Sequence, residues 1–499
     1  MANYFLTILT FSPLLGVLLL AFVPKTRAGT IKAIGILATL IPLVLAVMLY
    51  VNFDQAAKGL QLVQQSNWIN IPVGQDALHI KYEMGVDGLS MPLVVLTAVI
   101  GTMAAIAALT INKRWKEFYI LFLIIEMGMF GVFTALNLFQ FFVFFEFTII
   151  PMFFMFGIWG YQDREKAAMK FLLYNGVGSA IMLIVFVALF MNTLTINMEE
   201  IRQALTNPMS PFNVDEGLRF GLFLALLIAF AIKIPVVPFH TWMLKAYEEG
   251  HPAVIMISSG VLIKIGGYGL IRMNAAFFPQ WMDQMATFIA ILGVINILYG
   301  AVLALAQDDL KLVLAYSSVS HMGIVLLGLA AMNAEGFQGA IFQMVSHGLI
   351  AALMFYMVSI VHERTDTTNI SELGGLAKSM PVISGVLLTA MMASVGLPGM
   401  SGFISEFLAF LGLFGTRPAI AAVGALGIIL TAVYLLRAVL GTTFGPIQAK
   451  YESLSDARAF EVVPMVVLLS LVILIGVYPA VLSEPLQATL QNIVPRIGG

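Results

Sequence analysis

The chain has 499 residues, of which 60% are hydrophobic and only 10% charged, with a formal net charge of -2 and no cysteine. A soluble globular protein carries roughly 25% charged residues, so this composition excludes a soluble enzyme and predicts a polytopic, all-α membrane protein. Because cysteine is absent, the chain supplies no disulfide, no iron–sulfur ligand and no thiol nucleophile. No basic arm or patch indicates a nucleic-acid partner.

The N-terminal segment predicts a retained helix and not a cleavable signal peptide. A signal peptide places its positive charge before the apolar core. Here the apolar residues 3–23 come first, and Lys25 and Arg27 follow. That order favours a first transmembrane helix with its N-terminus on the outer side.

Apolar stretches long enough to cross a bilayer recur along the whole chain. A transmembrane helix needs roughly 20 mostly apolar residues, and the sequence predicts about fourteen such helices. The expected spans are 3–23, 30–51, 88–110, 118–136, 138–158, 167–191, 220–245, 253–273, 284–306, 311–331, 337–361, 381–410, 418–440 and 461–483.

The positive charges support this arrangement. With the N-terminus outside, 16 lysines and arginines fall on the inner side and 7 on the outer side. An excess of positive charge is typical of the cytoplasmic face. We therefore expect a multi-pass protein of the bacterial inner membrane with both termini on the outer side. The longest connections, 52–87 and 192–219, lie outside, and neither predicts a soluble domain.

Several ionisable residues lie inside predicted helices. In chain order they are Glu126, Glu146 (in "FFVFFEFTIIPM"), Lys233, Lys264, His321, His347 and Glu406. A charge at a helix centre costs about 2.5–3.5 kcal/mol on the insertion scale, which the surrounding apolar residues can offset. One such group could simply fix packing or satisfy a backbone break. Several on separate helices instead predict an ion or proton route.

Two predicted helices are interrupted beside these charges. Pro235 and Pro238 follow Lys233, and Pro398 with nearby glycines precedes Glu406. Broken helices are tolerated in a bilayer only where protein or water covers the freed backbone groups. Because the breaks fall in helices seven and twelve, they predict two inverted five-helix repeats, helices 4–8 and 9–13.

This organisation divides the chain into four parts. We expect the N-terminal helices 1–3 in residues 1–115, the first repeat in 116–275 and the second repeat in 276–440. Helix 14 and the tail would occupy 441–499.

Motifs around these charges resemble one family, the M-type (NuoM type, chain 4) antiporter-like membrane subunits of respiratory complex I. The resemblance covers about residues 85–480, and a glutamate at 406 is typical of M-type members, where N-type and L-type relatives have lysine. The motifs that carry it are "GVDGLS" (85–90), "FEFTIIPMFFMFGIWG" (145–160), "FAIKIPVVPFHTW" (230–242), "GVLIKIGGYGLIR" (260–272), "DLKLVLAYSSVSHMG" (309–323), "SHG" (346–348) and "LPGMSGFISEF" (397–407).

The resemblance implies a proton-translocating membrane-arm subunit of NADH:quinone oxidoreductase, driven by quinone reduction elsewhere in the complex. It implies no cofactor in this chain, with flavin, iron–sulfur clusters and quinone in partner subunits, and NuoN-like and NuoL-like subunits as neighbours in the lipid bilayer. The chain departs from the family after "HTW", where it reads "MLKAYEEGHPAV" (243–254) with Lys245 in place of a common aspartate. We therefore expect different proton-uptake chemistry at the inner mouth of helix seven.

The residues and the resemblance together predict a proton path. Glu146 would be the permanent counter-charge of a switchable pair with Lys233, because a lysine holds its proton tightly beside a carboxylate. Lys264 would be the next acceptor, and His321 and His347 would relay near neutral pH. Glu406 would pass the proton out, with waters between the side chains. The order of transfer rests on the resemblance.

Two residues join this prediction loosely. Glu126 fits the family pattern only in part. His240, in "FHTW", either gates the break or bonds to a freed carbonyl.

Other functions fit parts of the pattern. A D-type subunit of a multi-subunit Na⁺/H⁺ antiporter or of a membrane-bound hydrogenase shares the core motifs. A cytochrome could use His321 and His347 as haem ligands, but the lysines and broken helices would be unexplained. A scaffold subunit would carry inactive ion paths.

Overall fold

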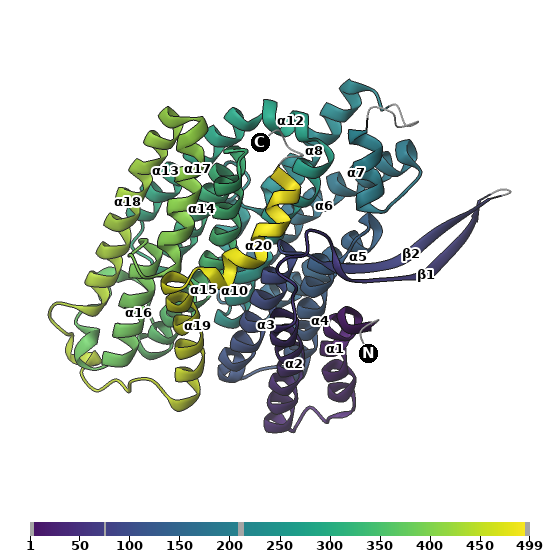
Figure 1. Ribbon diagram of the computed structural model, residues 1–499. Coiled ribbons are helices and arrows are strands. Elements are labelled where there is room, and N and C mark those ends of the chain that lie inside the picture. The colour runs from purple at the N-terminus through teal and green to yellow at the C-terminus, as the bar shows by residue number, and fades with distance from the viewer. Residues whose placement is uncertain (1–3, 74–75, 208–213, 495–499) are drawn as a thin grey trace.

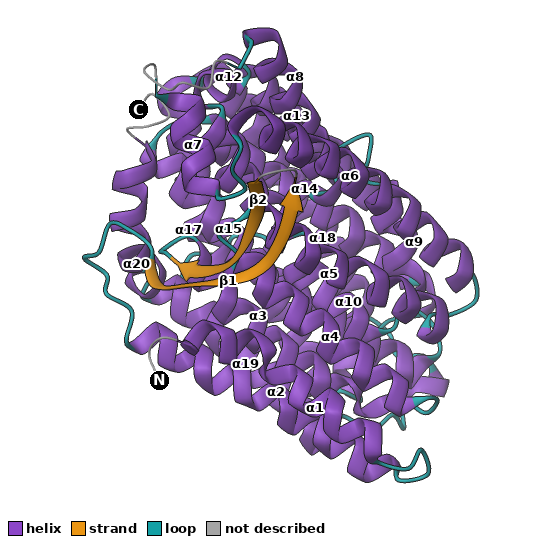
Figure 2. Ribbon diagram, turned by 90° about the vertical axis from the view of Figure 1, so that its right-hand side faces the viewer, coloured by secondary structure: helices purple, strands orange, loops and turns teal. Residues whose placement is uncertain are grey.

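The computed structural model describes residues 4–73, 76–207 and 214–494, and this part of the chain is mostly helical. The helices pack side by side in one elongated body, and a two-stranded hairpin projects from it (Figure 1). In a view turned by 90°, the hairpin lies in front of the helical face and outside the helix packing (Figure 2). The predicted helical membrane-protein class is confirmed.

The helices follow the predicted spans closely. The first half of the chain contains α1 (Phe5–Phe22), α2 (Ala28–Val51), α3 (Ser90–Ala107) with the short η2 (Ala108–Thr110), α4 (Trp115–Thr134), α5 (Leu138–Trp159), α6 (Arg164–Thr193), α7 (Met198–Thr206), α8 (Glu216–Lys233), α9 (Thr241–Glu249) and α10 (Pro252–Ile257), followed without a turn by η3 (Ser258–Leu262), α11 (Lys264–Gly269) and η4 (Leu270–Ala275). The second half contains α12 (Pro279–Gln284), α13 (Ala286–Leu305), α14 (Leu310–Ala330), α15 (Ala334–Thr365), η5 (Ile370–Glu372), η6 (Leu376–Lys378), α16 (Pro381–Ser394), α17 (Ser401–Thr416), α18 (Pro418–Thr443), η7 (Ala449–Tyr451), α19 (Ala459–Val477) and α20 (Ala480–Ile493).

Twelve helical segments among the described residues are long and apolar enough to cross a membrane. The interrupted pairs α8–α9 and α16–α17 occupy the predicted seventh and twelfth spans. The predicted total of fourteen counts each pair as one crossing and stays a prediction. The last predicted span, 461–483, extends too far: α19 ends at Val477, and α20 begins after Pro479. A proline disfavours helical backbone in the residue before it, which separates the two helices.

The connection 52–87 contains regular structure that the sequence analysis did not predict. Strand β1 (Gln61–Val73) pairs antiparallel with β2 (Asp76–Val86). The root of this hairpin is fixed by Glu83, whose backbone N–H donates to Gln140 Oε1 at 2.6 Å and whose carboxylate accepts from Asn197 at 2.9 Å. Apolar and polar residues alternate in β2 from Leu78 to Val86, the pattern from which half-buried strands are recognised, whereas β1 lacks a strict alternation.

The two interruptions differ in how far protein covers them, since Leu397, Pro398 and Gly399 of the second one are exposed. At the first break, Trp242 Nε1 donates to the carbonyl of Ile232 at 2.9 Å. Asn296, on α13, accepts from the backbone N–H of Val237 at 2.8 Å. These bonds satisfy groups that a continuous helix would have paired, so the break is compatible with a membrane interior. The second break, residues 395–400, begins with a backbone turn at Gly396, whose φ of 82° favours glycine.

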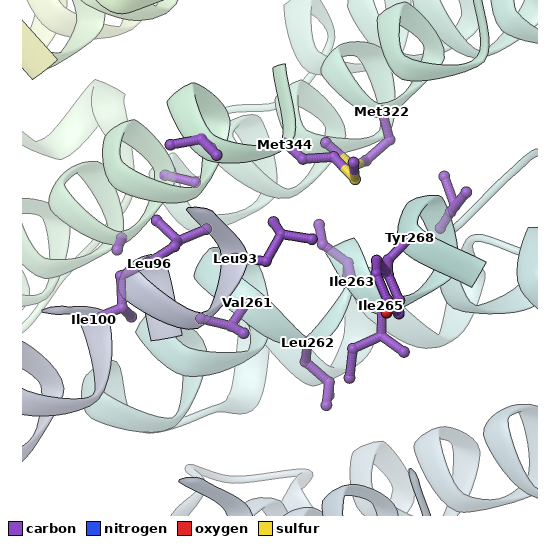
Figure 3. Close-up of a cluster of buried hydrophobic side chains, with 14 of the residues drawn as sticks. Leu93, Leu96, Ile100, Val261, Leu262, Ile263, Ile265, Tyr268, Met322 and Met344 are labelled. Atoms are coloured by element: carbon purple, nitrogen blue, oxygen red, sulfur yellow. The ribbon is translucent and has the colours of Figure 1, made fainter. Parts of the chain in front are cut away.

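The segment Pro252–Ala275 lies at the centre of the body and is buried along its whole length. It contains two π-helical turns, η3 and η4, on either side of α11. Figure 3 shows its Val261, Ile263 and Tyr268 between α3 and the methionines of α14 and α15. Gly260 and Gly348 let this segment approach α15, because a Cβ at Gly348 would lie 2.7 Å from the Gly260 carbonyl oxygen.

Two turns far apart in sequence repeat the same bonding pattern. After α6, Thr195 donates to Glu200, and Asn197 accepts from the N–H of Glu199 at 3.0 Å. After α15, Thr367 donates to Glu372 at 2.7 Å, and Asn369 accepts from the N–H of Ser371 at 3.1 Å. Each turn also pairs with the residue just before an earlier helix, Asn137 with Asn197 and Asp309 with Asn369. The turn between α6 and α7 beside the start of α5 therefore has the same local structure as the turn between α15 and η5 beside the start of α14.

Candidate functional site

Glu146, in the middle of α5, faces α6. Ser179 Oγ donates a hydrogen bond to Glu146 Oε1. Ser179 is buried and Glu146 is half-buried. A hydroxyl donor stabilises a carboxylate in apolar surroundings by a charge-assisted hydrogen bond, so Ser179 gives this carboxylate a partner on the neighbouring helix.

Lys233 is the last residue of α8, directly before the first break. Its ammonium donates to Asn175 Oδ1 at 3.2 Å and lies 4.7 Å from the centre of the Phe145 ring. Asn175 Nδ2 donates to the carbonyl of Phe171 at 3.0 Å, which turns the amide oxygen toward the lysine. A cation at the C-terminal end of a helix also meets the negative end of the helix dipole.

Helix α6 therefore holds the predicted pair apart. Asn175 and Ser179 lie one turn apart on the same face of α6, and each binds one member of the pair. No salt bridge joins Glu146 directly to Lys233 within the described residues. Sequence reasoning missed both α6 residues; the signal that could have found them is a pair of polar side chains at i and i+4 within the apolar helix, in "NGVGS" (175–179).

Lys264 and His347 form the start of a second cluster. Lys264 Nζ lies 2.9 Å from His347 Nδ1 and donates to the carbonyl of Ser259. Ser259 lies within the π-helical turn η3, five residues before the lysine. π-helical turns are frequent at functional sites, and here the turn provides an acceptor for the ammonium on its own helix. Lys264 is fully buried.

His321 continues this cluster toward the second break. Its ring centre lies 5.5 Å from that of His347. Its Nε2 lies 3.7 Å from Glu406 Oε1 and 3.0 Å from the carbonyl oxygen of Ser394, the last residue of α16. Its Nδ1 lies 2.7 Å from the carbonyl oxygen of Ser317. All of these side chains are buried.

A small cavity of about 10 Å³ lies between the histidines and Glu406. Gln343 and Ser346 share its wall with His321, His347 and Glu406. Its size is near the minimum that one water molecule requires. Lys264, His347, His321 and Glu406 thus form one row of neighbouring polar side chains from α11 to α17.

The structure brings the predicted residues together in two groups. Lys233 and Glu146 form the first group with Asn175 and Ser179, and Lys264 belongs to the second. Apolar side chains lie where α8 meets α11: a Cβ at Gly266 would lie 2.6 Å from Ile234 Cγ1, and a Cβ at Gly269 would collide with Phe230 Cε1.

Glu126 and His240 lie apart from both groups. Glu126, on α4, is fully buried against Gly101 of α3, and neither carboxylate oxygen has a hydrogen-bond partner within the described residues. His240 packs edge-on against Tyr299, with ring centres 5.2 Å apart.

The unusual segment after the first break forms an ionic cluster. Lys245 lies 2.9 Å from Glu248, 3.2 Å from Glu249 and 3.5 Å from Asp163. The hydrogen bonds of Lys166 and the charge of Lys245 hold the pKa of Asp163 below its usual range. The lysine that replaces a common aspartate therefore ties α9 to the loop before α6.

A second ion pair lies where β2 enters α3. Arg272 donates two hydrogen bonds to Asp87, at 2.7 and 2.8 Å, and one from Nε to Tyr268 at 3.1 Å. Burial opposes ionisation of Asp87, but the charge and hydrogen bonds of Arg272 outweigh it and hold the pKa of Asp87 below its ordinary value.

Comparison with known proteins identifies the family of this chain. The transmembrane family described as NADH:quinone oxidoreductase/Mrp antiporter matches residues 135–431, and the amino-terminal family of NADH-ubiquinone oxidoreductase chain 4 matches residues 30–136. NADH-quinone oxidoreductase subunit M of Rhodobacter capsulatus is 36% identical over 499 residues, covering 98% of this chain and 96% of that protein. NAD(P)H-quinone oxidoreductase chain 4 of Acaryochloris marina is also 36% identical, covering 99% and 92%.

Solved structures share the fold over the whole chain. A chain of respiratory complex I from Thermus thermophilus, solved with bound NADH, superposes with a TM-score of 0.88 at 27% identity, covering 99% of this chain and 100% of that one. A chain of the Mrp complex from Dietzia sp. has a TM-score of 0.85 at 21% identity, covering 100% and 99%, which shows a common fold. The chain belongs to the subunit M (chain 4) family of proton-translocating membrane subunits of NADH:quinone oxidoreductase.

Proposed function

We propose that this subunit moves protons through the two polar groups described above, with quinone reduction in partner subunits as the driving reaction. The observation that carries the proposal is a row of neighbouring buried polar side chains, Lys264, His347, His321 and Glu406, which lie on four different helical elements inside an apolar body. Buried ionisable groups are costly in a membrane and mark proton relays.

The first group acts as a switch. Lys233 and Glu146 are separated in this structure, each bound by a neutral partner on α6. A movement of α8 or α5 that brings lysine and carboxylate together would favour the charged lysine, and their separation would favour its release of a proton. Asn175 keeps the lysine hydrogen-bonded in the separated state.

The second group conducts. Lys264 receives the proton across the apolar gap at Gly266, and the histidines pass it to Glu406, which borders a lipid-facing groove lined by Phe403, Phe407 and Phe410. A water in the small cavity would connect His347 to Glu406. Because the gap holds apolar groups, transfer from Lys233 to Lys264 needs a transient water and is the controlled step.

We assign two inverted repeats to residues 116–275 and 276–440, preceded by residues 1–115 and followed by 441–499. The first group lies in the first repeat, and the second group joins Lys264 of the first repeat to His321, His347 and Glu406 of the second. The matched turns after α6 and α15 support this division. Five consecutive crossings separate the start of α5 from the start of α14, so the two turns would lie on opposite sides of the membrane.

The proposed location is the bacterial inner membrane, with N-type and L-type antiporter-like subunits as neighbours and all redox cofactors in other subunits. The projecting hairpin supports a subunit contact, because Val63 and Trp68 of its first strand are exposed. Both termini are placed on the outer side; residues 1–3 and 495–499 lie outside the described part.

Proton pumping by vesicles containing the assembled complex tests the function. Replacement of Lys264 by Ala should abolish most NADH-driven acidification while the complex still assembles, because no other cation begins the second group. Unchanged pumping by Lys264→Ala would refute the route. The exposed Lys58→Ala variant is the control for the loss of one lysine.

Sidedness is tested separately, because the chain has no cysteine of its own. In Ala57→Cys, an impermeant thiol reagent should label intact cells, whereas Glu452→Cys should react only after lysis. The reverse pattern would invert the proposed orientation.

A further inference from the structure

The two nitrogens of His321 have unusual partners. The closest atom to Nδ1 is the carbonyl oxygen of Ser317 at 2.7 Å, and the closest to Nε2 is the carbonyl oxygen of Ser394 at 3.0 Å. A carbonyl oxygen can only accept a hydrogen bond. A neutral imidazole has one N–H and one lone pair, so one of these contacts would set a lone pair against a lone pair.

A serine hydroxyl could donate to the unprotonated ring nitrogen, but both hydroxyls lie farther from the ring than hydrogen-bond partners usually do. Ser317 Oγ lies 3.3 Å from Nδ1, and Ser394 Oγ lies 3.4 Å from Nε2. Both are farther away than the carbonyl oxygens on the same residues. Ser317 Oγ also accepts from Tyr434 at 2.9 Å, which orients it within its own hydrogen-bond network.

We propose that His321 is held as a doubly protonated imidazolium, paired with a Glu406 carboxylate, by the carbonyl group of Ser317 on its own helix and the carbonyl group of Ser394 at the second helix break. Both nitrogens of an imidazolium are donors, which fits both carbonyl contacts. Glu406 lies 3.7 Å from Nε2 and supplies the opposite charge that a buried cation requires.

The interruption between α16 and α17 explains why the Ser394 carbonyl is free to take part. Ser394 ends α16, and the following N–H groups turn elsewhere: Gly396 donates to Ala393 and Leu397 donates to Met392. The break therefore exposes one carbonyl oxygen to the neighbouring helix, and His321 uses it. The break thus provides a hydrogen-bond acceptor for a protonated histidine on α14.

The other ionisable groups around His321 are consistent with a single charge there. Lys264 does not face His321 directly, because His347 lies between them. If the ammonium of Lys264 donates to His347 Nδ1, that histidine is neutral and carries its proton on Nε2. This nitrogen has no partner within the described residues, and the residue borders the small cavity beside Glu406. Tyr434 faces Ser317 from α18 and remains a neutral donor.

The inference deepens the proposed function, since it states which form of His321 waits in the relay, but the charge state can be measured without pumping. Nitrogen-15 magnetic resonance of histidine-labelled complex in lipid nanodiscs distinguishes the two forms, because only a neutral ring has an unprotonated nitrogen. At about pH 8.5, roughly two units above the ordinary histidine pKa of about 6.5, exposed histidines are neutral. A remaining imidazolium signal comes from a trapped charge.

We expect such a signal in the unaltered complex, its loss in His321→Gln and its conversion to a neutral ring in Glu406→Gln. His347→Gln is the matched control, since it removes a buried histidine from the same cluster and should retain the signal. Ser394→Ala keeps the carbonyl and should retain it too.

Absence of an imidazolium signal at this pH, or a signal that survives both His321→Gln and Glu406→Gln, would overturn the inference. If His321→Gln does not assemble, Glu406→Gln alone decides. If His321→Gln loses pumping but the unaltered complex shows no imidazolium signal, the charge assignment is refuted and the route is left intact. If the unaltered complex shows the imidazolium signal but His321→Gln pumps normally, the route is refuted and the charge assignment is left intact.

Discussion

Helices α6 and α15 occupy equivalent places in the two halves, and each carries one polar residue at the same distance from its turn. Asn175 precedes the turn residue Asn197 by 22 positions, and His347 precedes Asn369 by the same number. Each contacts a lysine ammonium, Asn175 at 3.2 Å and His347 at 2.9 Å. The difference is chemical: an amide can hold a lysine but cannot accept its proton, whereas an imidazole can do both.

The signs of the charges are also exchanged between the halves. In the first half the carboxylate lies on the unbroken α5 and the cation ends the broken α8. In the second half His321 lies on the unbroken α14 and the carboxylate lies on the broken pair, at Glu406. One framework can therefore be used as a switch or as a conductor, depending on which helix carries the acid and whether the intervening helix offers an amide or an imidazole.

The largest expected loss of pumping comes from replacing Lys233, whose ammonium binds the side-chain amide of Asn175. Lys233→Ala removes the group that takes up and releases a proton beside Glu146, so no proton would reach the second group. We expect NADH-driven pumping in vesicles to fall by about tenfold or more with assembly preserved. Glu146→Gln should do the same, and the double variant should be no worse than either one. An additive loss would show that the two residues act independently, and the comparison would fail.

A somewhat smaller effect is expected at Glu406. Among the described residues, Glu406 is the one carboxylate paired with His321; Glu406→Gln removes it, whereas Glu406→Asp keeps a titratable group. Pumping should fall several-fold more in Gln than in Asp, because a carboxyl group can take up and release a proton and an amide cannot. Equal pumping by Gln and the unaltered complex would remove Glu406 from the second group.

Exchanging the residue types of Asn175 and His347 tests directly whether the amide holds a lysine and the imidazole relays its proton. Asn175→Leu leaves the Lys233 ammonium without its acceptor and should reduce pumping by roughly three- to tenfold, since that bond is charge-assisted. Asn175→His restores an acceptor and should recover part of the loss. His347→Asn keeps a partner for Lys264 but cannot relay, so it should stay impaired. Initial rates of acidification measure all three, and equal rates for His347→Asn and the unaltered complex would contradict the conductor assignment.

The smallest effect on pumping is expected from Asp87→Asn, which lies outside both groups. It should lower the temperature at which the assembled complex dissociates, because Arg272 loses a buried partner at a cost of about 3–5 kcal/mol. The depressed pKa of Asp87 means that its stabilisation is present above the ordinary carboxyl pKa and is lost as pH falls through the folded value. Asp87→Asn should abolish that part of the acid dependence while pumping per assembled complex stays near normal.

Much of the fold could be predicted from hydropathy, because long apolar stretches leave few alternatives in a bilayer. Glu146, Lys233, Lys264, His321, His347 and Glu406 were identifiable for the same reason: charge is conspicuous among apolar residues. Asn175 and Ser179 were not, since neutral polar side chains are common in helices and only packing shows which neighbour they meet. The carbonyl of Ser394 could not be found from any residue type, because it belongs to the backbone and is exposed by the break.

The π-helical turn η3, which precedes Lys264 in the same helical segment, determines the direction in which this side chain points. Each such turn holds one residue more than an α-helix would, and one residue corresponds to about 100° of rotation about the helix axis. If residues 258–262 closed into an ordinary α-helix without losing a residue, the residues after them would be rotated by about that angle. The ammonium would then swing away from His347 although its depth in the membrane would change by only about 1.5 Å. The contact between Lys264 and His347 is thus specified by how many residues precede the lysine in its helix as much as by the lysine itself.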